Sequence, residues 1–91
     1  MGGQVKKQPL TGFQIRAARA VVKWSAEILA RRSSVSLRTI RRAELTDHQT
    51  SMTAQNDLAI RHAFELAGVE FIEENGGGPG VRLLKSPQKR R

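Results

Sequence analysis

The chain contains no cysteine, which excludes disulfide bonds and metal sites built from thiolates. Acidic residues are scarce as well, with eight Asp and Glu against sixteen Lys and Arg, for a net charge of +8. The resulting isoelectric point is about 11.4. A protein with this charge attracts polyanions, so nucleic acid is the first class of partner to consider.

Long apolar segments are also missing. The longest apolar run is too short to span a bilayer, and no apolar signal-peptide core follows the amino terminus. We therefore expect a soluble protein of the cytoplasm, associated with the nucleoid if its partner is DNA, and no membrane contact.

Residues that could support catalysis are few. His48 and His62 have no third or fourth ligand at the spacing of a metal site. The serines lie in no motif typical of a Ser–His–acid hydrolase. We therefore predict that the protein is not an enzyme and uses no metal and no cofactor.

The 91 residues are enough for one small domain. Residues 1–9 and 85–91 are polar, basic and contain proline, which predicts a flexible basic tail at each end. The folded domain is expected over residues 10–84, with a carboxy-terminal hairpin over about 69–84.

Four short helices are predicted, each preceded by a serine or threonine that can accept hydrogen bonds from the first free N–H groups. The predicted N-caps are Thr11, Ser25, Ser36 and Thr53. The helices are expected over about 12–22, 26–32, 37–45 and 54–67. Gly68 occupies the position after the last helix where a left-handed residue is common.

After Gly68 the apolar period changes to two. The segments VEFIEE and VRLL flank the glycine-rich ENGGGPG at residues 74–80, which predicts a β-hairpin. A phosphate-binding loop is the alternative, but it needs a Lys-Ser/Thr pair at a helix start, and Val81 and Arg82 follow instead. An isolated hairpin is marginally stable, so its apolar side chains should pack on the core. These side chains are Val69, Phe71, Val81 and Leu83; Trp24 and Phe64 are also expected in the core.

The predicted helix 37–45 has a cationic outer face. With about 100° per residue and Ile40 pointing inward, Arg38 and Arg42 point outward and Arg41 lies on the flank. Such a face is often merely solvated. Here, however, the preceding helix ends with Arg31 and Arg32, and a turn of about three residues joins the two helices. Two short helices joined in this way are typical of a helix-turn-helix, whose second helix enters the DNA major groove.

The stretch LTGFQIRAARAVVKWSAEILARRSSVSLRTIRRAE resembles the XRE-type, Cro/repressor-like helix-turn-helix family of bacterial transcriptional regulators. The resemblance covers about residues 10–68. The continuation GVEFIEENGGGPGVRL resembles the tail of a short subgroup common in alphaproteobacteria. The resemblance implies a mainly α fold, a lambda-repressor-like domain of four to five helices that carries the hairpin at its carboxyl end.

The resemblance also implies which residues meet DNA. They are Ser25, Arg31, Arg32, Ser36, Leu37, Arg38, Thr39, Arg41 and Arg42. Arg19 and Glu44 match a family ion pair that ties the first helix to the third. The chain departs from the family pattern at Ala26, where a glutamine is usual, and at Ser34, where a glycine with positive φ is common.

The function implied is sequence-specific binding to double-stranded DNA as a dimeric repressor or autoregulator. Such regulators usually act as homodimers on palindromic operators, and we expect residues 53–84 to form the dimer surface. Two alternatives stay open. One is a protein-binding module that partners another regulator, as an antiactivator or antitoxin does, which the apolar Ala26 and Ile28 favour. The other is sequence-independent binding through charge.

Overall fold

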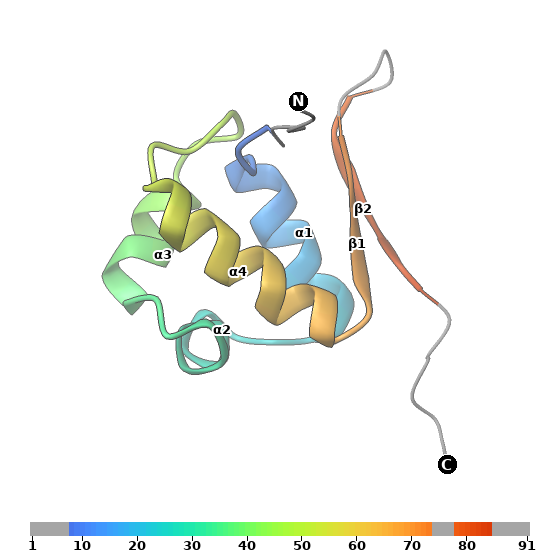
Figure 1. Ribbon diagram of the computed structural model, residues 1–91, viewed down its shortest axis with the longest axis horizontal. Helices are drawn as coiled ribbons and strands as arrows, with labels where there is room; N and C mark the ends of the chain where they lie inside the picture. Colours follow the sequence, from blue (N-terminus) through green and yellow to red (C-terminus); the bar gives the residue numbers. More distant parts are fainter. Residues whose placement is uncertain (1–7, 74–77, 85–91) are drawn as a thin grey trace, which may run out of the picture.

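The computed structural model describes residues 8–73 and 78–84. Most of the predicted amino-terminal tail, the whole predicted carboxy-terminal tail and the first four residues of the glycine-rich loop lie outside the described residues. The order of elements is α1 (Gly12–Val22), α2 (Ala26–Ser33), α3 (Leu37–Ala43), α4 (Ala54–Leu66), β1 (Val69–Ile72) and β2 (Gly80–Leu83). Four helices followed by an antiparallel hairpin confirm the predicted fold class (Figure 1).

The predicted caps are all present. Thr11 Oγ1 accepts from Gln14 N over 2.9 Å. The caps Ser25, Ser36 and Thr53 each accept in the same way from the amide three residues later, over 3.1 Å. These bonds satisfy N–H groups that the helices leave free, which is why each helix begins where it does.

Helix α3 is shorter than predicted, since it ends at Ala43 and not at residue 45. The Leu45 amide donates to the Arg42 carbonyl over 3.2 Å, three residues back. This tighter turn leaves the α-helical pattern and exposes 85% of Leu45.

The core lies between the four helices and the hairpin, and all four helices contribute buried side chains to it. Its largest fully buried side chains are Leu10, Ile15, Leu29, Ile40, Ile60, Phe64 and Val69. Phe64 is the aromatic centre of this core. Trp24 stacks on it with ring centroids 5.3 Å apart, and Phe71 meets it edge-on at 5.8 Å. The prediction that these aromatic residues belong to the core is therefore confirmed.

The start of α1 is fastened to the linker between α3 and α4. Gly12 N donates to the His48 carbonyl over 3.0 Å, and Thr50 N donates to the Leu10 carbonyl over 3.1 Å. A Cβ atom on Gly12 would lie 1.9 Å from the carbonyl oxygen of Thr46. The close approach of helix and linker therefore requires glycine at this position.

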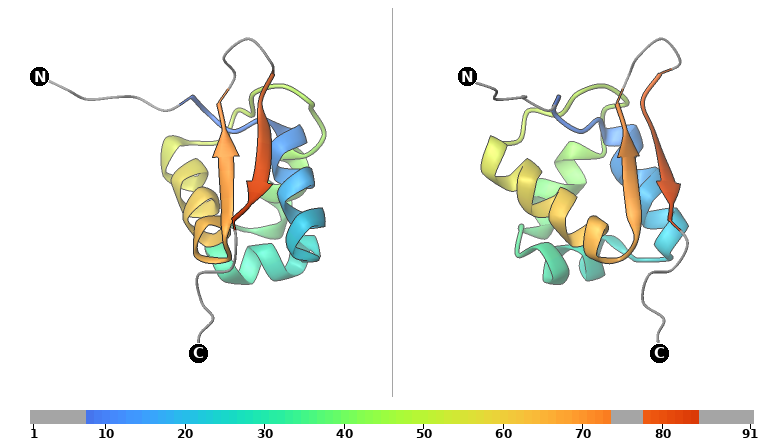
Figure 2. Two further views of the ribbon diagram at one scale, coloured as in Figure 1. Left: turned by 90° about the vertical axis from the view of Figure 1, so that its right-hand side faces the viewer. Right: turned by 45° about the vertical axis from the view of Figure 1, so that its right-hand side comes forward.

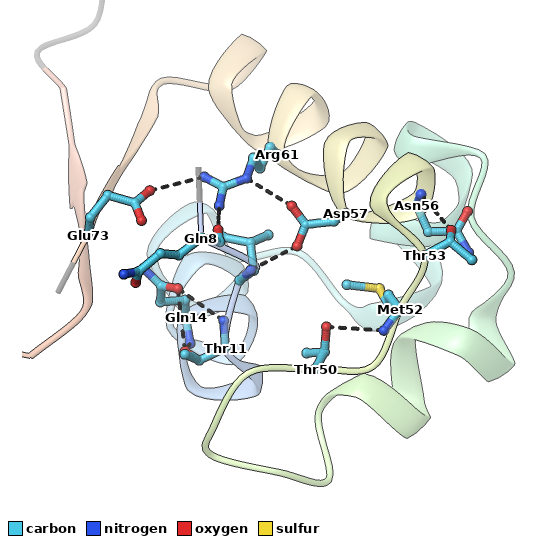
Figure 3. A network of polar contacts seen from close by, with 11 residues as sticks. Gln8, Thr11, Gln14, Thr50, Met52, Thr53, Asn56, Asp57, Arg61 and Glu73 are labelled. Atoms are coloured by element: carbon cyan, nitrogen blue, oxygen red, sulfur yellow. Dashed lines mark hydrogen bonds and ion pairs between the residues drawn. The ribbon is translucent and has the colours of Figure 1, made fainter. Parts of the chain in front are cut away.

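A buried polar network joins the amino-terminal segment, α4 and the hairpin (Figure 3). The side chain of Arg61 is 5% exposed and lies 2.9 Å from Asp57 Oδ1 and 3.6 Å from Glu73 Oε2. Arg61 also donates to the Gln8 carbonyl, and Asp57 Oδ2 accepts from Leu10 N over 2.8 Å. Because the buried guanidinium has two carboxylate partners, these interactions offset the free-energy cost of removing its charge from water.

In the hairpin, Val69 pairs with Leu83 and Phe71 pairs with Val81. Figure 2 shows the two strands laid over α1 and α4, with β2 beside α1. Val69 is buried and Phe71 and Val81 pack on the core, as predicted. For Leu83 the prediction was wrong, because this side chain is 53% exposed. It lies at the hairpin end beside Gly68, which has no side chain to cover it.

Candidate nucleic-acid interface

The turn between α2 and α3 is rigid. Ser33 is buried; its Oγ donates to the Leu29 carbonyl over 2.7 Å and accepts from Val35 N over 3.1 Å. Val35 is 4% exposed and anchors the turn in the core. Ser34 has a left-handed backbone with φ 62°, a conformation that glycine adopts with less strain.

The cationic face of α3 points outward, as predicted from the rotation of about 100° per residue. Ile40 and Ala43 are buried, whereas Arg38, Arg41 and Arg42 are exposed. Arg41 forms an ion pair with Glu27 of α2 over 3.1 Å. Within residues 8–73 and 78–84, no carboxylate lies within ion-pair distance of Arg38 or Arg42.

The other candidate residues of α3 differ in accessibility. Ser36 is exposed at the amino end of the helix, and its hydroxyl donates to Thr39 Oγ1 over 2.9 Å. Thr39 is half-buried. Leu37 is also half-buried and packs against the core, so only part of its side chain faces solvent.

The candidate residues of α2 and its N-cap differ in exposure and in the contacts that they make. Ser25 and Arg31 are exposed. The guanidinium of Arg32 lies over the Trp24 ring, 5.4 Å from its centroid, which is a cation–π contact. Ala26, which sequence reasoning offered as part of a partner-binding surface, is 7% exposed and belongs to the core. That interpretation of Ala26 was wrong, because Ala26 lies on the same buried side of α2 as Leu29.

The ion pair between Arg19 and Glu44 is present and bidentate. Arg19 Nε and Nη2 each donate to a different oxygen of Glu44 over 2.8 Å, and Nη1 donates to the Trp24 carbonyl over 3.1 Å. The hydrogen bond to Glu44 raises the pKa of Arg19 above its ordinary value, against the opposing effect of burial. The pair joins α1 to the end of α3 and so fixes the orientation of the cationic face.

Sequence reasoning missed a groove beside this face. It has a volume of ≈ 690 Å³ and is lined by residues of α3, the following linker and the start of α4. Arg38 and Arg42 stand on one side, and Thr53 and Asn56 on the other; Figure 3 shows the latter two at the start of α4. The only sequence feature that pointed to this region was Thr53, which was predicted as the N-cap of the fourth helix.

Three further observations concern metal ligands, helix length and the two histidines. No three His, Cys, Asp or Glu side chains gather as metal ligands in the part of the chain that the structure describes. No helix there is long and apolar enough to cross a bilayer. His48 and His62 are both exposed.

Comparison with known proteins returns no family model and no curated protein that matches this chain. The function is therefore inferred from the interface itself.

Proposed function

We propose that this protein is a sequence-specific DNA-binding transcriptional regulator of the XRE-type, Cro/repressor-like class, which reads the major groove with α3. One observation carries the proposal. Arg38, Arg41 and Arg42 share the solvent face of a helix held rigidly against α2, and Arg38 and Arg42 have no carboxylate partner within the described ranges.

The chemistry of this face suits a duplex. A B-DNA major groove admits one α-helix, and a guanidinium can bond the O6 and N7 atoms of guanine at once. Each such pair supplies about 1 to 3 kcal/mol of discrimination between bases. Ser36 and Ser25, exposed at the amino ends of α3 and α2, are suited to phosphate contacts, because helix amino ends attract anions.

A single module of this size reads few base pairs, so the proposal includes a homodimer on a palindromic operator. Residues 53–84 lie outside the α2–α3 pair, and they are the part assigned to dimer formation. The bound dimer blocks or repositions the polymerase, and it regulates its own gene. Its place in the cell is then the nucleoid.

The test is fluorescence anisotropy with the duplex upstream of the protein's own gene and with a scrambled duplex, at about 150 mM salt. We expect a preference of about a thousandfold for the upstream duplex. Arg42→Ala should weaken specific binding by about tenfold to a hundredfold. Lys23→Ala, which removes an exposed basic side chain outside both the DNA-facing residues and residues 53–84, is the matched control and should leave binding unchanged. Equal weak binding to both duplexes, unaffected by Arg42→Ala, would contradict the proposal.

A second candidate function is binding to another regulator protein. Leu45 favours it, since this apolar side chain is 85% exposed at the rim of the groove that Arg38 and Arg42 line. Leu45→Ala removes most of this apolar side chain and should abolish capture of such a partner. Under the DNA proposal, Leu45→Ala changes specific affinity little, which separates the two.

A further inference from the structure

The groove between α3 and the start of α4 combines positive charge with apolar surface. Arg38 and Arg42 supply the charge, and Leu45 and Met52 supply most of the apolar part. The other lining residues are Ala43 and side chains that carry hydroxyl or amide groups. Among the described residues, no acidic side chain lines this groove. Its charge is therefore positive throughout, and an anionic partner meets no repulsion there.

The carboxylates of the surrounding segments are held by other arginines. These ion pairs are Glu27 with Arg41, Glu44 with Arg19, Asp47 with Arg16, and Asp57 with Arg61. None of these acids lies within ion-pair distance of Arg38 or Arg42. The two guanidinium groups of the groove are therefore available to a carboxylate from another molecule.

The spacing of the charged and apolar side chains matches a helix. Arg38, Arg42 and Leu45 lie at positions i, i+4 and i+7, and all three line the same groove. Partners of the helix-in-groove kind use anchors at this spacing. A second helix laid along the groove can thus present two carboxylates and one apolar side chain to these three residues.

Leu45 distinguishes a protein partner from a nucleic acid. This side chain is 85% exposed, and Met52 is half-buried across the same groove. Phosphates can satisfy the arginines, but a sugar-phosphate backbone offers little apolar surface for a leucine. An acidic and apolar protein segment satisfies both, since arginine binds a carboxylate through two parallel hydrogen bonds. The net charge of +8 also speeds the approach of an acidic partner.

We propose that an acidic amphipathic helix of a partner protein docks in this groove, with two carboxylates on Arg38 and Arg42 and an apolar side chain against Leu45 and Met52. Arg38 and Arg42 are also the proposed DNA-reading residues, so the partner helix and DNA exclude each other. The partner thereby releases the regulator from its operator. This release rests on the function proposed above, whereas the docking itself does not.

Fluorescence anisotropy of the full chain with a labelled peptide, and without DNA, tests the docking. The probe is an alanine- and glutamine-rich helix of about 16 residues with the pattern Leu-x-x-Glu-x-x-x-Glu-x-x-Leu, which is the same in both directions. At about 150 mM salt we expect a dissociation constant of about 10 to 100 μM. A peptide with glutamine in place of both glutamates should bind at least about tenfold more weakly.

A third peptide has the same composition, but its glutamates lie on the face opposite the leucines. It should also bind at least about tenfold more weakly, because no orientation then satisfies the arginines and Leu45 together. Equal binding of this peptide and the probe would mean that the surface recognises charge alone, and would overturn the proposal. An absence of binding by the probe at about 1 mM would overturn it as well.

Variants of the protein place the peptide in the groove. Leu45→Ala and Arg42→Ala should each weaken binding of the probe at least about tenfold. The matched controls are Leu66→Ala, a leucine of α4 that is 73% exposed and lies outside the groove, and Lys23→Ala. Both controls should leave binding unchanged, and circular dichroism verifies that each variant is folded. Full binding by Leu45→Ala would contradict the docking.

A competition titration tests the release of DNA. The probe is added to the complex of the protein with labelled upstream duplex, whose anisotropy should fall, and the midpoint should rise with the concentration of free duplex. A peptide that binds without releasing the duplex would refute mutual exclusion. If the protein binds the duplex but not the peptide, this inference fails and the DNA-binding proposal stands. If it binds the peptide but reads no operator, the DNA-binding proposal fails and the docking stands.

Discussion

Arg41 of α3 and Glu27 of α2 form an ion pair over 3.1 Å on the outer face of the helix pair. Both side chains are more than half exposed, so the pair adds little to stability. The pair matters more for the cationic face. It occupies the guanidinium of Arg41, whereas those of Arg38 and Arg42 have no carboxylate partner within the described residues.

Glu27→Gln should therefore strengthen binding to any duplex. The substitution removes a negative charge from the proposed DNA-facing surface and frees Arg41 for a phosphate, so the slope of log affinity against log salt should steepen by about one. Anisotropy titrations at several salt concentrations measure this slope. Asp47→Asn, which breaks the exposed ion pair of Arg16 outside the proposed DNA-facing residues, is the control and should not change it. An unchanged slope in Glu27→Gln would mean that Arg41 does not reach the backbone.

The Arg19–Glu44 pair should stabilise the fold. Glu44 is 11% exposed, so Arg19→Met leaves a nearly buried carboxylate without its partner. We expect the free energy of unfolding to fall by about 2 to 4 kcal/mol, measured by urea denaturation with Trp24 fluorescence. Asp47→Asn, which breaks the exposed pair with Arg16, should cost less than about 1 kcal/mol. Equal losses for the two variants would refute the role assigned to Glu44.

Gly12→Ala should be among the most damaging substitutions of a small residue. The added methyl would meet the carbonyl oxygens of Thr46 and Ala43 at 1.9 and 2.5 Å, and backbone must move to admit it. We expect a loss of more than about 3 kcal/mol in the free energy of unfolding. Gly80→Ala is the control, because the nearest atom there is 4.0 Å away. A stable Gly12→Ala protein would mean that the linker can separate from α1.

Ser34→Gly should stabilise the protein. Ser34 has φ 62°, and a non-glycine residue in this region is strained by about 1 kcal/mol. The thermal midpoint should rise by a few degrees. Lys23, with φ 61° after α1, offers a second site of the same kind, and Lys23→Gly should act likewise. In Ser51→Gly, where φ is not positive, the midpoint should fall slightly instead.

The local parts of the structure could be predicted from the sequence, because they depend on neighbouring residues. Thr11, Ser25, Ser36 and Thr53 cap their helices through amides three positions on. With Ile40 taken as the inward residue, the helical period also placed Arg38 and Arg42 on the outer face. The ion pair of Arg19 and Glu44 was implied only by the resemblance to a family.

Contacts between distant segments could not be predicted in this way. Gln14 looks like an ordinary helix residue, yet it holds the hairpin through carbonyls 58 and 66 positions away. Arg61 shows no sign in the sequence of being buried, since arginine is rarely so. The exposure of Leu83 depends on the lack of a side chain at Gly68 beneath it, which alternation of apolar residues does not reveal.

Backbone hydrogen bonds at Gly12, His48 and Thr50 fasten α1 to the linker. The polar contacts that join α1, the linker, α4 and the hairpin do not involve the outward side chains of α3. Arg38, Arg41 and Arg42 can therefore be exchanged with little effect on folding. The domain is thus open to evolutionary change, or to directed evolution in the laboratory, at the positions that face outward, while the rest of the sequence stays constant.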